Sequence, residues 1–169
     1  EAIKYIKKSI ALDSTLIEPY YNLCEIYDKT NKLEEFAKTL TSVPNSIKND
    51  PSIQLKKGQL KFREKQFFKC IKILNGINVQ NLSAQKKSIL YELLGKSFDF
   101  VQNFEKAYLN FSRMNENSLD IANKIGINAE VYKKNITERL QSFTEKPYTI
   151  FNKVEIKDES SLTFIIGFP

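Results

Sequence analysis

The chain has 169 residues, 41% of them hydrophobic, and only five glycines and five prolines, which argues against a many-turned all-β protein and favours long helices. Its net charge of +6 comes from lysines that are mixed with acids in nearly every segment, so solvated helical surfaces are expected and nucleic acid is not the expected partner. No apolar stretch is long enough to span a membrane, and residues 1–8 lack the apolar core of a signal peptide, so we expect a cytoplasmic protein.

The first segment, residues 1–13, carries apolar residues at helical spacing, among them Ala2, Ile3 and Ile6. We interpret this segment as the second helix of a helical hairpin whose first helix is missing. Because such a unit cannot bury its apolar face alone, the chain is expected to begin inside a longer protein.

Two later segments share one layout of aromatic and small residues. In each, sixteen residues (20 to 36 and 91 to 107) separate the first aromatic residue from the start of a second motif. The first copy is Tyr20-x-x-Leu23-Cys24-x-x-Tyr27, then Leu33 and Phe36-x-x-x-Leu40; the second is Tyr91-x-x-Leu94-Gly95-x-x-Phe98, then Phe104 and Ala107-x-x-x-Phe111. A weaker copy between them keeps Gly58, Phe67, Cys70 and Leu74 in register, but Gln54, Lys57 and Lys61 replace the expected apolar residues and leave its first helix in doubt.

The second motif recurs at a nearly constant interval. Its first position falls at Ala2, Phe36 and Cys70, 34 residues apart, and then at Ala107 after 37, with the extra residues in the connection 75–83. This pattern resembles the tetratricopeptide repeat, which is about 34 residues long. The resemblance implies an all-α fold of antiparallel hairpins stacked as a right-handed solenoid over residues 1–116, with a partial first repeat followed by repeats at about 17–50, 51–87 and 88–116.

Small side chains are expected where the two helices of each hairpin cross, because close approach of two helix backbones leaves little room between them. The predicted crossing residues are Gly95, Gly58 and Cys24 on first helices and Ala107, Cys70 and Ala2 on second helices. Phe36 departs from this rule, so either its hairpin is splayed or its ring fills a gap left by a neighbour.

The repeat pattern stops after Met114, and residues 115–118 predict a polar break. A helical stripe of apolar residues follows, interrupted by Gly126, which predicts a kink or two helices divided near residues 126–128. The stripe comprises Ala122, Ile125, Ala129, Tyr132, Ile136, Leu140 and Phe143. We expect residues 117–146 to cap the repeats, and Pro147 to end the helical region.

Residues 147–169 change character and predict an extended or β tail that ends in the apolar run 162–166. The closing residues, Phe164-Ile165-Ile166-Gly167-Phe168-Pro169, resemble the opening strand of the sulfotransferase domain in bacterial tetratricopeptide–sulfotransferase fusions. That resemblance implies a truncated α/β domain in which Gly167, Phe168 and Pro169 begin an incomplete loop for the phosphosulfate of PAPS. The strand could instead open another phosphate-binding α/β domain, or belong to no enzyme.

Catalytic chemistry is absent from the chain itself. Without histidine there is no Ser-His-Asp or Cys-His centre and no imidazole metal site, and Cys24 and Cys70 lack the spacing of a zinc site or a disulfide framework. We therefore expect no catalytic residue, no metal and no cofactor in this fragment, with PAPS as the cofactor of the suspected parent sulfotransferase.

The favoured function is a protein-interaction scaffold that positions the acceptor of a downstream sulfotransferase. The first helices are expected to line a groove for a protein or peptide, through Tyr21, Glu25, Asp28, Gln59, Phe62, Glu92, Lys96 and Asp99. The alternatives are a stand-alone adaptor and a self-associating scaffold, the latter as a homodimer through the C-terminal strand.

Overall fold

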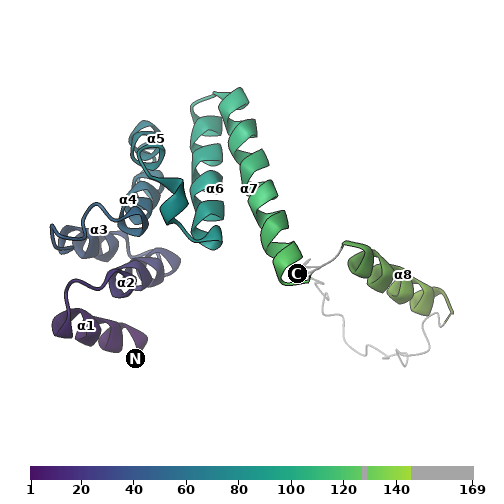
Figure 1. Cartoon of the computed structure of the whole chain (residues 1–169), viewed down its shortest axis with the longest axis horizontal. Coiled ribbons are helices and arrows are strands. Elements are labelled where there is room, and N and C mark those ends of the chain that lie inside the picture. The colour runs from purple at the N-terminus through teal and green to yellow at the C-terminus, as the bar shows by residue number, and fades with distance from the viewer. Residues whose placement is uncertain (127–128, 146–169) are drawn as a thin grey trace, which may run out of the picture. The chain divides into compact units, whose positions relative to one another are not determined.

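The computed structural model describes residues 1–126 and 129–145, and these residues are helical with short connections (Figure 1). They form the α-helices α1 (Ala2–Leu12), α2 (Ile17–Lys29), α3 (Leu33–Thr41), α4 (Pro51–Arg63), α5 (Phe67–Asn75), α6 (Ala84–Phe100), α7 (Phe104–Lys124) and α8 (Ala129–Glu145), with a 3-10 helix η1 (Val79–Asn81) before α6. The all-α expectation is confirmed for this part of the chain.

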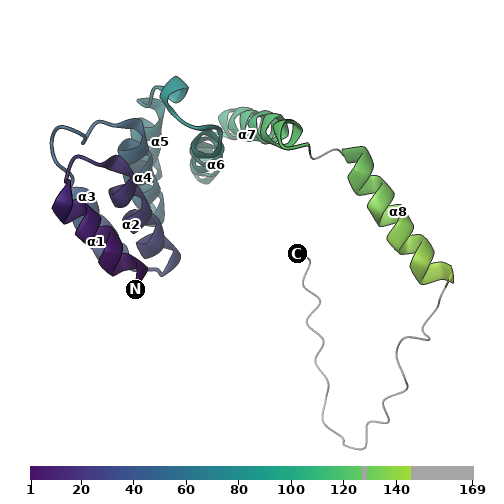
Figure 2. The same ribbon diagram turned by 60° about the horizontal axis from the view of Figure 1, so that its bottom comes forward.

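The chain divides into two compact units, residues 1–126 and 127–169. In the first unit, α2 packs on α3, α4 on α5 and α6 on α7, each pair joined by a three-residue turn as a helical hairpin (Figures 1 and 2). Successive hairpins also touch, because α2 contacts α4 and α4 contacts α6, while α1 packs on α2. The division into 1–116, 117–146 and 147–169 stays a prediction.

The three hairpin turns have the same backbone conformation. Asn31, Lys65 and Gln102 each have a positive φ, between 55° and 59°. In each turn the following amide donates to a carbonyl five residues earlier at 2.8 Å: Lys32 N to Tyr27 O, Gln66 N to Lys61 O and Asn103 N to Phe98 O. These bonds satisfy the last carbonyls of the first helix in the manner of a Schellman motif. The turns therefore recur at intervals of 34 and 37 residues (31, 65, 102), as the second-helix positions do.

We expect the substitution Gln102→Gly to raise the free energy of unfolding by about 0.5–1 kcal/mol, because glycine adopts the left-handed conformation without the penalty that other L-residues carry. Gln102 is exposed, so little packing is lost. Urea denaturation followed by circular dichroism measures the change. The matched control, Gln85→Gly in the first turn of α6, should lower stability, since glycine is unfavourable inside a helix. Equal effects of the two substitutions would contradict the turn geometry.

Two of the predicted crossing glycines accommodate large side chains of the partner helix. A Cβ atom on Gly58 would lie 2.3 Å from Leu74 Cδ2, and one on Gly95 would lie 2.7 Å from Phe111 Cε1. Glycine is needed at these positions because the leucine and the phenylalanine ring of the second helix occupy the space of a side chain.

The remaining crossing positions are buried, with one exception. Cys24, Cys70 and Ala107 are almost fully inaccessible, which confirms their structural role. Ala2 is exposed, and the prediction that it lies at a crossing is wrong. It stands in the first turn of α1, and this helix buries its partly covered residues Ile3, Ile6 and Ile10 against the α2 and α3 core instead.

Phe36 is fully buried in the core that α2, α3 and α4 share. Its neighbours there include Tyr20, Leu23, Cys24 and Ile53. The ring therefore fills interior space, which agrees with the second of the two alternatives considered for it.

The polar break expected at residues 115–118 is wrong, because α7 continues through it to Lys124. Asn117 Nδ2 donates to the carbonyl oxygen of Ala84 at 2.7 Å and to Ser88 Oγ at 2.6 Å, so this polar stretch is bonded to the first turns of α6. The expected division near Gly126 is confirmed: Gly126 has φ +75° just after α7, and a separate helix begins at Ala129.

In the second unit, α8 carries Tyr132, Ile136 and Leu140 of the predicted apolar stripe, and these three residues are exposed. Its capping role stays a prediction. The expected β tail, 147–169, lies outside the described residues. None of the helices in the described part of the chain combines the length and apolarity that a membrane span requires.

Candidate partner-binding site

The predicted groove residues lie on one side of α2, α4 and α6, here called the first-helix face. Charged side chains connect the three helices on this face. Lys86 of α6 connects all three helices: its Nζ lies 2.8 Å from Glu18 Oε1 on α2, 3.0 Å from Ser52 Oγ on α4, and 4.3 Å from the centre of the Tyr21 ring. One lysine thus fixes the beginnings of three successive first helices relative to one another.

Lys56 of α4 lies deeper, with a side chain that is 2% exposed. Its Nζ lies 4.0 Å from the centre of the Tyr21 ring, donates to Gln59 Oε1 at 3.0 Å, and lies 3.6 Å from Glu25 Oε2. Burial lowers the pKa of Lys56, although Glu25 opposes this shift. A buried ammonium group is costly unless its neighbours satisfy it, and here an aromatic face, an amide and a carboxylate do so.

Tyr21 was expected to be presented in the groove, but the structure buries it, with 6% of its surface exposed. Lys56 and Lys86 both lie against its ring. Burial, reinforced by the nearby carboxylates of Glu25 and Glu18, raises the pKa of Tyr21 to about 12. The residue therefore organises the lysines of this face and does not offer its ring to a partner.

A second set of contacts ties the ends of α2 and α4. Gln59 Nε2 donates to Asp28 Oδ2 at 2.8 Å, and Arg63 Nε lies 3.3 Å from Asp28 Oδ1 without a hydrogen bond to it. Arg63 also donates to Asn31 Oδ1 at 2.7 Å. Asp28 and Gln59 are thus brought together as the repeat register predicted, but they bind each other across the two hairpins.

Phe62 belongs to an aromatic cluster at the end of the same face. Its ring packs edge-on against Phe67, 5.6 Å away, and Phe100, 6.0 Å away, and these two rings stack on each other at 4.4 Å. Since Phe100 is exposed, the cluster joins the second and third hairpins and offers an apolar edge to solvent.

The other predicted groove residues are accessible. Glu92 and Lys96 form an ion pair along α6 with both side chains nearly half exposed, and Asp99 is exposed one turn further on. Glu25 is 36% exposed and pairs with Lys29 at 2.8 Å; the hydrogen bond from Lys29, with help from Lys56, lowers its pKa. The face therefore exposes the carboxylates of Glu25, Glu92 and Asp99, the first two of them paired with exposed lysines, while Lys56 and Lys86 lie deeper.

The predicted set omitted Lys56, Lys86 and Arg63, which hold this face together. The sequence did contain a signal for Lys56. The corresponding residue of the next hairpin, 37 residues later, is the buried Leu93, so Lys56 stands where that hairpin has a core residue. Lys86 carried no such signal, because its ion-pair partner, Glu18, is 68 residues away in the chain.

Cys24 and Cys70 are free thiols in the two hydrophobic cores. Burial raises the pKa of Cys24 to about 12, with Lys56 acting in the opposite direction. Burial also raises the pKa of Cys70, whose Sγ accepts a hydrogen bond from Ser97 Oγ at 3.3 Å. Both thiols are thus held protonated and inaccessible, as packing residues are.

The fold and this face define an all-α protein of stacked helical hairpins with a charged first-helix face. No family model and no solved structure matches the chain. A lysine–tRNA ligase of Wigglesworthia glossinidia brevipalpis is 29% identical to it over 145 residues, a match that covers 79% of this chain and 28% of the ligase. The chain therefore spans just over a quarter of the length of that curated relative. The predicted loop residues Gly167, Phe168 and Pro169 lie outside the described residues, and their role with PAPS stays a prediction.

Proposed function

We propose that the chain is a protein-binding scaffold of the tetratricopeptide type, in which the hairpins form a right-handed solenoid and the first-helix face binds a segment of a partner protein. The recurrence of one turn conformation at Asn31, Lys65 and Gln102 carries this proposal. Repeated units that contact only their neighbours place equivalent side chains in rows, and such rows suit an extended partner.

The chemistry of the partner follows from which charges on this face are accessible. Lys56 and Lys86 are engaged below the surface, whereas Glu18 is 65% exposed and Glu92 is 44% exposed. Together with Asp99, these carboxylates favour a partner segment that carries lysine or arginine beside an apolar side chain, the latter for the exposed edge of Phe100.

Peptides selected from a random displayed library test the proposal. We expect selected peptides to be enriched in basic residues and to bind the charge-reversed variant Glu92→Lys/Asp99→Lys about tenfold more weakly than the unaltered chain, a difference of about 1.4 kcal/mol. Glu34→Lys/Glu116→Lys is the matched control, because it makes the same change of charge at exposed residues away from the face. Equal weakening by both variants would show that only net charge matters, and the proposed face would then be rejected.

The narrower proposal places this scaffold before a PAPS-dependent sulfotransferase, where it would orient the acceptor. It rests on the resemblance of residues 164–169, and the gene sequence beyond Pro169 decides it. An Arg-Ser-Gly-Thr-Thr-like continuation is expected, and a further helical repeat would contradict it. We do not extend aminoacylation from the ligase to this chain, because the match covers 28% of that enzyme and identifies no reaction centre here.

A further inference from the structure

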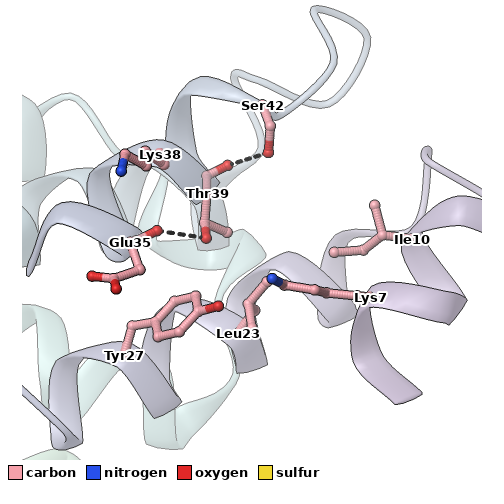
Figure 3. Close-up of a pocket in the computed structure, with 8 residues that line it drawn as sticks. All are labelled: Lys7, Ile10, Leu23, Tyr27, Glu35, Lys38, Thr39 and Ser42. Atoms are coloured by element: carbon pink, nitrogen blue, oxygen red, sulfur yellow. Dashed lines mark hydrogen bonds between the residues drawn. The ribbon is translucent and has the colours of Figure 1, made fainter. Parts of the chain in front are cut away.

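Two grooves open at corresponding places in the first and third hairpins. One, of about 350 Å³, lies between α1, α2 and α3, with Leu23 and Tyr27 among the residues that line it (Figure 3). The other, of about 330 Å³, lies between α5, α6 and α7, with Leu94 and Phe98 in the corresponding places. We call them the α2 groove and the α6 groove.

The two grooves match residue by residue. Leu23, Tyr27, Thr39 and Ser42 of the α2 groove each have a counterpart 71 residues later in the α6 groove, namely Leu94, Phe98, Asn110 and Arg113. This interval corresponds to two repeats. The grooves are therefore one structural feature of the hairpin that occurs twice.

In the middle hairpin the corresponding first-helix positions are lysines. Lys57 and Lys61 stand 34 residues after Leu23 and Tyr27. Lys57 Nζ donates to the carbonyl oxygen of Lys48 at 3.1 Å, Gln54 Nε2 donates to the same oxygen at 2.8 Å, and Lys61 pairs with Glu64 at 2.7 Å. Gln54 and Lys57, two of the polar residues that weakened the middle repeat in the sequence, thus bind the connection before α4, where the other hairpins have an open groove.

Cations without an ion-pair partner line both open grooves. Lys7 and Lys38 border the α2 groove, and Lys106 and Arg113 border the α6 groove; none of the four forms an ion pair within the described part of the chain. Glu35 is the acid among the residues of the α2 groove, and Lys106 takes its place in the α6 groove. Lys106 Nζ also lies 5.6 Å from the centre of the Phe98 ring.

We propose that the α2 and α6 grooves are two equivalent docking sites for a partner protein segment in which single large apolar side chains are flanked by carboxylates. The apolar lining accepts the leucine-like side chain, and the unpaired cations at each groove complement the acids. With 3.6 residues per helical turn, these residues of α2 lie on roughly the opposite side of the helix from Tyr21, Glu25 and Asp28. The inference therefore adds a second surface, of opposite charge preference, to the proposed function.

The experiment titrates the isotopically labelled chain with a twelve-residue peptide of four Glu-Glu-Leu units, and with its Gln-Gln-Leu counterpart, by NMR. We expect two sites, reported by amide shifts around Thr39 and Ser42 and around Asn110 and Arg113. The variant Lys7→Glu/Lys38→Glu should lose the first site alone, and Lys106→Glu/Arg113→Glu the second alone. The glutamine peptide should bind about tenfold more weakly or worse.

The control Lys4→Glu/Lys133→Glu changes the net charge equally at exposed lysines outside both grooves, and it should keep both sites. Each variant is first shown to be folded by circular dichroism. Shifts on the first-helix face in place of the grooves, a single site, equal loss in the control, or equal binding of the glutamine peptide would each overturn the inference. Loss of the groove sites would leave the outcome of the Glu92→Lys/Asp99→Lys experiment unchanged, so this inference and the proposed function can fail separately.

Discussion

Replacing Phe36 by alanine is expected to lower the free energy of unfolding by about 3–5 kcal/mol, the usual cost of deleting a buried phenylalanine ring. The ring is fully buried, and it packs in the core that α2 and α3 share with α4. The repeat pattern alone predicts the opposite result. The corresponding positions of the other hairpins hold the small residues Cys70 and Ala107, so alanine at position 36 would improve the match to the pattern. Urea denaturation followed by circular dichroism distinguishes the two expectations, since the midpoint should fall.

The matched control is Phe68→Ala in α5, which removes the same ring from a position that is 77% exposed. Its effect should stay within about 0.5 kcal/mol, as is usual for surface substitutions. If Phe36→Ala were neutral or stabilising while the chain stayed folded, the first hairpin would have to close around a small residue. The packing of α2 on α3 described here would then be incorrect.

The hairpin register could be predicted from the sequence because it depends on local spacing. Small and aromatic residues recur on the same helix faces, and the intervals of 34 and 37 residues place both helices of each hairpin. Even the doubtful first helix of the middle repeat forms, as α4, because it buries Ile53 and Leu60 in one hydrophobic core and Leu55 in the other, despite Lys57 and Lys61.

The features that the sequence did not reveal depend on partners far away in the chain. Asn117 looked like part of a helix break, but its hydrogen bonds to Ala84 and Ser88 let it lie inside α7. The sequence predicted that Tyr21 lies on the surface, but in the structure Lys56 of α4 and Lys86 of α6 lie against its ring. Periodicity describes the face of one helix, whereas these contacts require the stacking of three hairpins.

Enlarging the small residue at the third crossing is the second substitution with a large expected effect. Ala107→Phe should lower the free energy of unfolding by about 1–3 kcal/mol through overpacking. Ala107 is 4% exposed in a core with Leu90, Leu94 and Phe98, so we expect an added ring to displace some of these side chains. The urea midpoint is the measurement, and it should fall while the helical content of the folded state is kept.

Asn115→Phe adds a ring to the same helix at an exposed position and serves as the control. It should leave the midpoint nearly unchanged, because the new side chain meets solvent. The comparison separates overpacking from any general effect of an additional phenylalanine in α7. An unchanged midpoint for Ala107→Phe would mean that residue 107 does not lie between α6 and α7. Because the corresponding positions in the other hairpins are assigned by the same intervals, the match between the α2 and α6 grooves would lose its support as well.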